Sequence, residues 1–196
     1  MKSIAEEKNK LNERRGFFSR MFATGVVGIG LMSTSLEAKN AAKTTILTEA
    51  QKEELFFIYE EEKLARDVYI TLGELYPDEN TFASIQLSEQ RHMDAAEALC
   101  EKYGVDISMV DESRIGFFTL EELQELYDGL VEQGRESLYG ALESAIYIEE
   151  LDIGDLTELI EETGMPSDIV KVYENLREGS YNHLEAFQTS ISRVNT

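Results

Sequence analysis

Apolar residues recur every three to four positions along most of the chain after residue 47, and this spacing is typical of amphipathic α-helices. Thr48 with Gln51, and Thr119 with Glu122, match the capping-box pattern that opens a helix. Pro77 ends the first helical pattern. The pattern predicts four long helices and a short one, at about 48–76, 81–104, 119–133 (the short one), 137–163 and 166–193.

The lengths of the links between these helices predict how the bundle is connected. The links between the first and second long helices and between the third and fourth are short, so each pair is expected to form an antiparallel hairpin. The link between the two hairpins is longer than thirty residues and contains the short helix. We therefore predict an all-α fold, a four-helix bundle with one long crossover, which is the ferritin-like arrangement rather than a simple up-and-down bundle.

Polar residues interrupt the apolar stripe near the middle of each long helix. In the register of a bundle core, the inward polar positions are Glu62, Glu89, His92, Glu149, Asp152 and His183. Unpaired carboxylates are costly to bury, and none of these registers contains Lys or Arg. Acids from three helices together with two imidazoles predict a divalent metal pair. Ligands rich in oxygen with two nitrogens suit iron or manganese.

Two alternatives to this ligand set remain open at this point. Arg66 and Arg91 lie beside the inward register and could supply the counter-charge, which would make the cluster a structural polar network. A shift of one residue in the third long helix would replace Glu149 by Glu150 as the inward acid.

The charge of the chain is strongly negative and unevenly distributed. The formal net charge is −21; residues 1–43 carry +4 and the remainder carries −25. An acidic surface repels phosphate backbones, so nucleic-acid binding is not expected. Cys100 is the single cysteine, which excludes an internal disulfide, a zinc knuckle and a rubredoxin-type iron centre; we expect it to pack on a helix.

The first forty residues resemble an export signal. Arg14 and Arg15 precede Gly16 and a weakly apolar run, and a region of small residues follows. The paired arginines look like a twin-arginine signal, which implies export of a folded protein to the periplasm or beyond. The apolar run is too short and rich in glycine for a comfortable membrane span, so contact with the membrane is expected only through the signal. We therefore divide the chain into a signal peptide with linker (1–43) and a bundle domain (44–196).

Two sequence motifs extend the likeness to a known family. In "EKLARDVY", Glu62 precedes Ala65 by three positions and Tyr69 by seven, and "EQRHMDA" contains Glu89 and His92 in a Glu-x-x-His pattern. Both resemble helix motifs of rubrerythrin-type di-iron carboxylate domains in the ferritin-like superfamily. The chain also looks like a little-characterised ferritin-like branch of bacterial and archaeal proteins.

The later helices complete the resemblance over residues 48–193. Glu149 and Asp152 fit the paired acids of the third helix, with Asp in place of Glu, and His183 fits the histidine of the fourth. The resemblance implies two irons per chain. It assigns Tyr69 as a hydrogen-bond donor beside the metals and the six inward acids and histidines as ligands.

One position departs from that family pattern. The fourth helix should carry Glu-x-x-His, but residue 180 is Ser. The missing carboxylate leaves the second metal position open: it could be weak, hold a water, or recruit Glu178 or Glu185.

Three functions follow from these observations. The first is a di-iron redox enzyme that reduces peroxide or oxidises Fe(II); with no rubredoxin domain, its electrons come from another protein or from the iron itself. The second is a metal carrier or sensor without turnover, and the third is a structural bundle with a buried polar network. The resemblance is also compatible with a homodimer.

Overall fold

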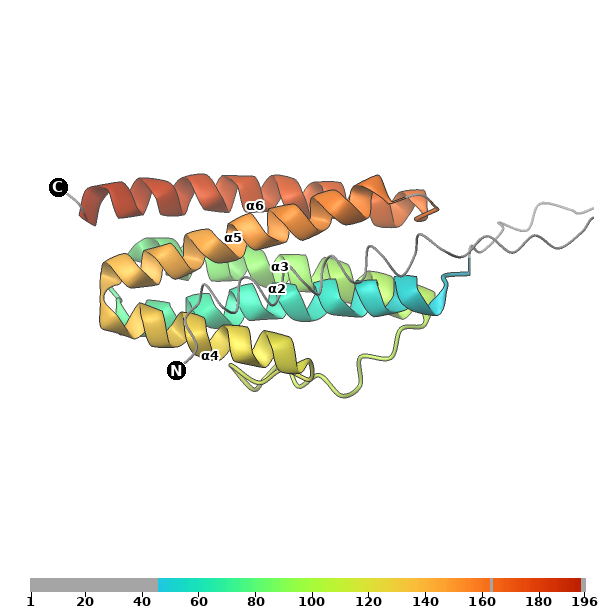
Figure 1. Cartoon of the computed structure of the whole chain (residues 1–196), viewed down its shortest axis with the longest axis horizontal. Helices are drawn as coiled ribbons and strands as arrows, with labels where there is room; N and C mark the ends of the chain where they lie inside the picture. The colour runs from blue at the N-terminus through green and yellow to red at the C-terminus, as the bar shows by residue number, and fades with distance from the viewer. Residues whose placement is uncertain (1–45, 163, 195–196) are drawn as a thin grey trace, which may run out of the picture. The chain divides into compact units, whose positions relative to one another are not determined.

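The computed structural model describes residues 46–162 and 164–194, and these residues contain helices and no strand. The predicted all-α fold is confirmed (Figure 1). The helices are α2 (Glu49–Leu75), α3 (Asn80–Tyr103), α4 (Glu121–Glu136), α5 (Leu138–Glu161) and α6 (Ser167–Val194). Residues 47 onward form one compact unit.

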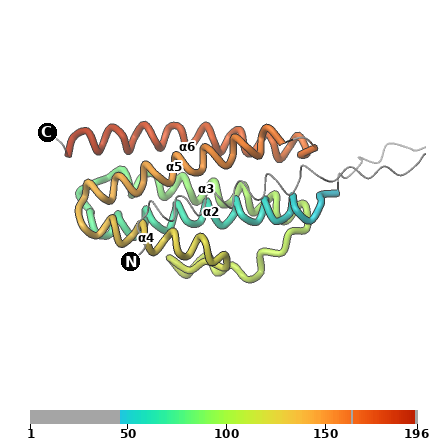
Figure 2. Tube along the Cα trace, in the orientation of Figure 1, coloured from blue at the N-terminus to red at the C-terminus, as the bar shows by residue number. Residues whose placement is uncertain are grey.

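Two antiparallel hairpins pack together to make the bundle. Helices α2 and α3 form one hairpin and α5 and α6 form the other, and both run along the same long axis (Figures 1 and 2). Helix α2 also contacts α4 and α5. The long link after α3 passes along the outside of the bundle before the chain enters α4 (Figure 1). The predicted connectivity, including the short helix in the crossover, is therefore present.

The structure confirms one predicted helix cap and corrects the other. The Thr48 side chain accepts from the backbone N–H of Gln51, and the Gln51 side chain accepts from the backbone N–H of Thr48, as in a capping box. The prediction for Thr119 was wrong, because α4 begins at Glu121 and has no side-chain cap. Instead, Thr119 donates its N–H and its hydroxyl to the buried carboxylate of Glu60, at 2.8 and 2.9 Å.

The predicted inward register describes α2 and α6 closely. Every position predicted to face inward on α6 is buried: Ile169, Tyr173, Leu176, Ser180, His183 and Phe187. The same holds for α2, at Leu55, Ile58, Glu62, Ala65, Tyr69 and Leu72. Cys100 is buried on α3, as expected, and burial raises the pKa of its thiol to about 12. The register therefore places the polar positions of these helices inside the bundle.

The proposed signal segment, residues 1–43, lies outside the described residues. Within the described part of the chain, no helix combines the length and the apolar composition needed to cross a membrane.

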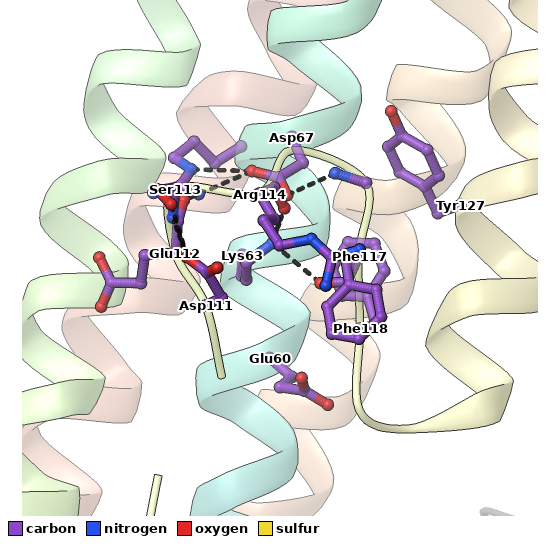
Figure 3. A network of polar contacts seen from close by, with 12 residues as sticks. Glu60, Lys63, Asp67, Asp111, Glu112, Ser113, Arg114, Phe117, Phe118 and Tyr127 are labelled. Atoms are coloured by element: carbon purple, nitrogen blue, oxygen red, sulfur yellow. Dashed lines mark hydrogen bonds and ion pairs between the residues drawn. The ribbon is translucent and has the colours of Figure 1, made fainter. Parts of the chain in front are cut away.

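A buried lysine anchors the crossover to the outer side of α2 (Figure 3). Lys63 is fully buried and forms an ion pair with Asp67, one helical turn further on, at 2.5 Å. Its ammonium also donates to the carbonyls of Arg114 and Phe117, both at 3.1 Å, and lies 4.6 Å from the ring centre of Phe118. Four interactions thus satisfy a charge that would otherwise be too costly to bury.

Asp67 is the shared acceptor of this anchor. One carboxylate oxygen takes the Lys63 contact and the backbone N–H of Gly116 at 3.0 Å, and the other accepts from two nitrogens of Arg66. Gly116 has a φ of 73°, a left-handed conformation that glycine adopts without strain. The crossover loop is therefore held on α2 through one carboxylate.

Replacing Asp67 by Ala is expected to lower the free energy of unfolding by about 3–5 kcal/mol, because it leaves Lys63 and Arg66 without their shared carboxylate. Urea unfolding followed by circular dichroism measures this change. Glu49→Gln is the control, since it removes an exposed ion pair to Lys52 and should change stability by less than about 0.5 kcal/mol. Equal effects of the two substitutions would contradict the anchoring role of Asp67.

Candidate metal centre

All seven residues singled out from the sequence meet in the interior of the bundle. Helix α2 contributes Glu62 and Tyr69, α3 contributes Glu89 and His92, α5 contributes Glu149 and Asp152, and α6 contributes His183. The four carboxylates are each no more than 5% exposed. Most of the other inward positions of these helices are apolar, so the amphipathic register itself brings these polar groups inside.

Glu89 lies between the two imidazoles. Its Oε2 is 2.8 Å from Nδ1 of His92, and its Oε1 is 2.7 Å from Nδ1 of His183. His92 Nδ1 also lies 3.2 Å from Oε2 of Glu62. Glu89, His92 and His183 each present a ligand atom within 4.8 Å of the others, which is close enough for a single ion to contact all three.

Residues from α5 close the other side of the cluster. The Tyr69 hydroxyl donates to Oε1 of Glu149 at 2.6 Å, and Oε2 of Glu149 lies 3.6 Å from Nδ1 of His183. The Ser180 hydroxyl donates to Oδ2 of Asp152 at 2.5 Å. One oxygen of Glu149 and one of Asp152 are thus held by hydroxyl groups, which fixes how each carboxylate is oriented.

Each of the four long helices leaves one buried polar atom of this cluster without a hydrogen bond. These atoms are Glu62 Oε1, Glu89 Oε1, Asp152 Oδ1 and His183 Nδ1. The approach of His183 Nδ1 to Glu89 Oε1 is close but lacks the alignment of a hydrogen bond. Buried polar groups almost always have partners, so four exceptions in one place need an explanation. A cation placed among these atoms would be one such explanation.

Close pairing with carboxylates changes the proton affinity of both imidazoles. Burial alone would lower the pKa of His92, but Glu62 and Glu89 outweigh it and raise the pKa to about 11. Glu149 and Glu89 likewise overcome burial and raise the pKa of His183 to about 10. Burial would raise the pKa of Glu89, but its contacts with His183 and His92 lower it to about 2. Without a metal, these three groups are therefore charged at neutral pH.

The remaining carboxylates shift in the opposite direction. Burial raises the pKa of Glu62 to about 7, although His92 opposes the shift, and burial together with Glu89 raises that of Glu149 to about 8. Burial and the charge of Glu62 raise the pKa of Asp152 well above its usual range. Protons thus neutralise the cluster when nothing else does, and a bound metal ion would displace them.

The arginine alternative does not agree with the structure. Arg66 points to the outer side of α2, where it donates to Asp67 and to Oε1 of Gln90 at 2.6 Å. Arg91 is exposed. Among the described residues, no Lys or Arg forms an ion pair with Glu62, Glu89, Glu149 or Asp152.

The acids considered as replacement ligands are also excluded by their positions. Glu150 is exposed while Glu149 is buried, so the predicted register of the third long helix was right. Glu178 and Glu185 are exposed, and neither occupies the place left by Ser180. Ser180 itself is 1% exposed and serves Asp152 through its hydroxyl.

Two residues of this region were missed from the sequence. A Cβ on Gly179 would lie 2.5 Å from Nε2 of His92, so only glycine leaves room for this ring against α6. Its position next to an inward Ser was the available signal. Glu61 is buried beside Asp155 on α5, although the register placed it outside the inward stripe.

In the metal-free protein, neither imidazole is expected to lose its proton between about pH 5.5 and 8.5, because both pKa values are raised. Their contribution to stability is complete below the unfolded pKa near 6.5 and is lost as the pH rises through about 10 to 11. NMR of the imidazoles measures this directly, since the chain has two histidines.

Glu89→Gln should bring both imidazole pKa values down, whereas Glu150→Gln on the exposed face should leave them unchanged. An imidazole of the unsubstituted protein that titrates near pH 6.5 would contradict the geometry described above.

Comparison with known proteins places the chain among relatives of similar length. It is 46% identical over 141 residues to the uncharacterized protein MJ0754 of Methanocaldococcus jannaschii, an alignment that covers 72% of this chain and 75% of the relative. The crystal structure of hypothetical protein MJ0754 from this archaeon superimposes with a TM-score of 0.72 at 41% identity, over 83% of this chain and 88% of the other. The family described as uncharacterized protein domain DUF2202 matches residues 51–195, and the chain belongs to this family.

Proposed function

We propose that the bundle binds two divalent metal ions between α2, α3, α5 and α6. The observation that carries this proposal is the set of buried atoms without hydrogen bonds, one from each of these helices. Two bound cations would give all of these atoms a partner, while the described part of the chain offers no Lys or Arg partner to these acids. The six ligands are Glu62, Glu89, His92, Glu149, Asp152 and His183.

The donor set favours iron, with manganese as the other candidate. Four carboxylates and two imidazoles combine hard oxygen donors with nitrogen, which suits both metals better than magnesium or calcium. Glu89 presents one oxygen toward each imidazole, so it and the two histidines would be available together to hold metal. This arrangement agrees with the resemblance to rubrerythrin-type, ferritin-like domains.

The proposed chemistry is reduction of peroxide or oxidation of Fe(II). Iron bound at this centre would supply electrons to O2 or peroxide, and an external donor would restore them. The chain itself would orient the carboxylate ligands and exclude water from their surroundings. Tyr69 holds Glu149 by a hydrogen bond, and its ring packs on Phe187 and Phe82, with centroids 4.9 and 6.3 Å away. A cluster of buried apolar residues from α2, α3, α5 and α6 includes Met93 and Leu176.

Export is part of the same proposal. The twin-arginine-like pattern at Arg14 and Arg15 supports transport of a folded chain, and a protein that must keep its metal benefits from folding before transport. The acidic composition of the remaining chain supports cations rather than nucleic acids as its partners.

The full chain, loaded with Fe(II) without oxygen and freed of loose metal by gel filtration, should retain two irons per chain. His183→Ala and Glu89→Gln should each remove most of this metal, because they delete donors that face the shared centre. Elemental analysis measures the content.

Glu150→Gln is the matched control, since it removes an acid next to Glu149 from the exposed face. Wild-type protein that retains neither iron nor manganese would overturn the metal centre and leave a buried polar network in its place.

A metal carrier without turnover is the second candidate, and Ser180 is the observation that favours it. In the rubrerythrin-type pattern this position carries a carboxylate, and here it carries a hydroxyl. The proposed pair of metal ions would therefore have one charged ligand fewer. The two functions differ in whether the loaded protein consumes peroxide.

Iron-loaded protein should consume hydrogen peroxide in a stopped-flow assay, and Tyr69→Phe should slow this reaction about tenfold or more with little loss of iron. The reason is that the substitution removes only the hydroxyl that orients Glu149. Tyr76→Phe is the control, because its hydroxyl bonds to the carbonyl of Gly134, away from the centre. Iron-loaded protein that leaves peroxide untouched would favour the carrier.

A further inference from the structure

A second group of buried acids lies beside the candidate centre, between α2 and α5. Glu61 is 1% exposed and Asp155 is 6% exposed, and the charge of Asp155 acts strongly on the carboxyl group of Glu61. Asp152 and Glu62 add their charges to the same place. Four acidic side chains from two helices thus gather on one side of the bundle interior.

Glu61 has no donor to satisfy it. Neither of its carboxylate oxygens has a hydrogen-bond partner, although both are buried. Every charged group that acts strongly on it is another acid, namely Asp155, Asp152 and Glu62. Lys63, two residues further along α2, points outward to the crossover instead. There it pairs with Asp67 and donates to the carbonyl of Arg114. The protein leaves this buried carboxylate without a compensating base.

The same kind of pairing recurs two helical turns away, toward the end of the bundle. Helices α2 and α5 run antiparallel and contact each other (Figure 1). Glu54 precedes Glu61 by seven residues and Glu162 follows Asp155 by seven, a separation of about 10 Å along each helix. The charge of Glu162 likewise acts on Glu54, and both residues are only half-buried. Acidic residues of α2 and α5 therefore face each other at two levels of this interface, one near its middle and one two turns closer to the end of the bundle.

We propose that Glu61 and Asp155 form an additional binding position for a divalent cation, next to the centre, and that this position shares Asp152 with the centre. The orphaned oxygens of Glu61 face it, and the half-buried pair Glu54 and Glu162 lies on the approach from the bundle end. The position does not depend on the proposed redox chemistry.

The donors of this position are oxygens alone. Carboxylates without imidazole select hard cations such as Mn2+, Fe2+ and Mg2+, whereas the neighbouring centre also offers two nitrogens. Mg2+ should therefore compete with Mn2+ at the position of Glu61 more effectively than at the centre. This difference allows the two sites to be measured separately in one protein.

The test is a titration of the chelator-treated full chain with Mn2+, in which the electron paramagnetic resonance of the free ion reports what remains unbound. Glu61→Gln and Asp155→Asn should each bind one Mn2+ fewer per chain than wild type. His183→Ala should still bind the Mn2+ ion that Mg2+ displaces from the position of Glu61. It should bind Mn2+ more weakly at the centre. Glu150→Gln, on the exposed face of α5, should match wild type.

The melting temperatures of the variants, measured with and without Mn2+, separate a loss of metal binding from a folding defect. Without metal, Glu61→Gln should melt no lower than wild type, because burial and the neighbouring acids raise the pKa of Glu61 well above its usual range and the amide then replaces a neutral carboxyl group. With Mn2+, its melting temperature should rise less than that of wild type. If Glu61→Gln binds as many Mn2+ as wild type with the same affinities, the pair merely shares a proton and the inference is overturned. If His183→Ala binds as wild type does, the proposed centre fails while the position of Glu61 stands.

Discussion

Buried charges along α2 must be neutralised inside the protein, and this requirement shapes both the crossover and the bundle interior. Between Tyr59 and Tyr69 every residue of the helix is buried, and the run contains four acids and two bases: Glu60, Glu61, Glu62, Lys63, Arg66 and Asp67. A helix covered on all sides is normally apolar on all sides. Each of these charges must therefore find a partner inside the protein, and the partners determine what packs against α2.

The two sides of α2 meet this requirement differently. On the outer side, Lys63 and Arg66 neutralise Asp67, and the N–H groups at Thr119 and Leu120 satisfy Glu60, so the crossover loop completes the balance. On the inner side no Lys or Arg of the described chain forms an ion pair with Glu61 or Glu62. Imidazoles from α3 and α6 supply part of the compensation, and a cation supplies the rest in the function proposed above. The loop and the centre are thus two solutions to one electrostatic problem.

The periodic pattern was sufficient to predict the inward residues of α6 and the seven residues that meet at the candidate centre, because those faces pack against other helices. It was insufficient for Lys63, Asp67 and Glu61. A register with one inward face assigns such charges to solvent, but the crossover loop and α5 cover these faces of α2, and neither contact is visible in local spacing. Thr119 failed for the same reason, since a distant carboxylate on Glu60 takes the donors that a local cap would use. The need for glycine at position 179 could not be predicted either, because it depends on where the His92 ring lies once the helices have packed.

Ser180 has a place in the same charge balance. The four carboxylates of the centre carry four negative charges when ionised, and two divalent ions with neutral imidazoles balance them without remainder. A glutamate at position 180 would add a fifth negative charge in a region where Glu61 already lacks a base among its strongest electrostatic neighbours. The hydroxyl instead donates to Asp152, whose charge also acts on Glu61. Ser180 thus contributes no ligand charge but orients a carboxylate that both proposed positions share.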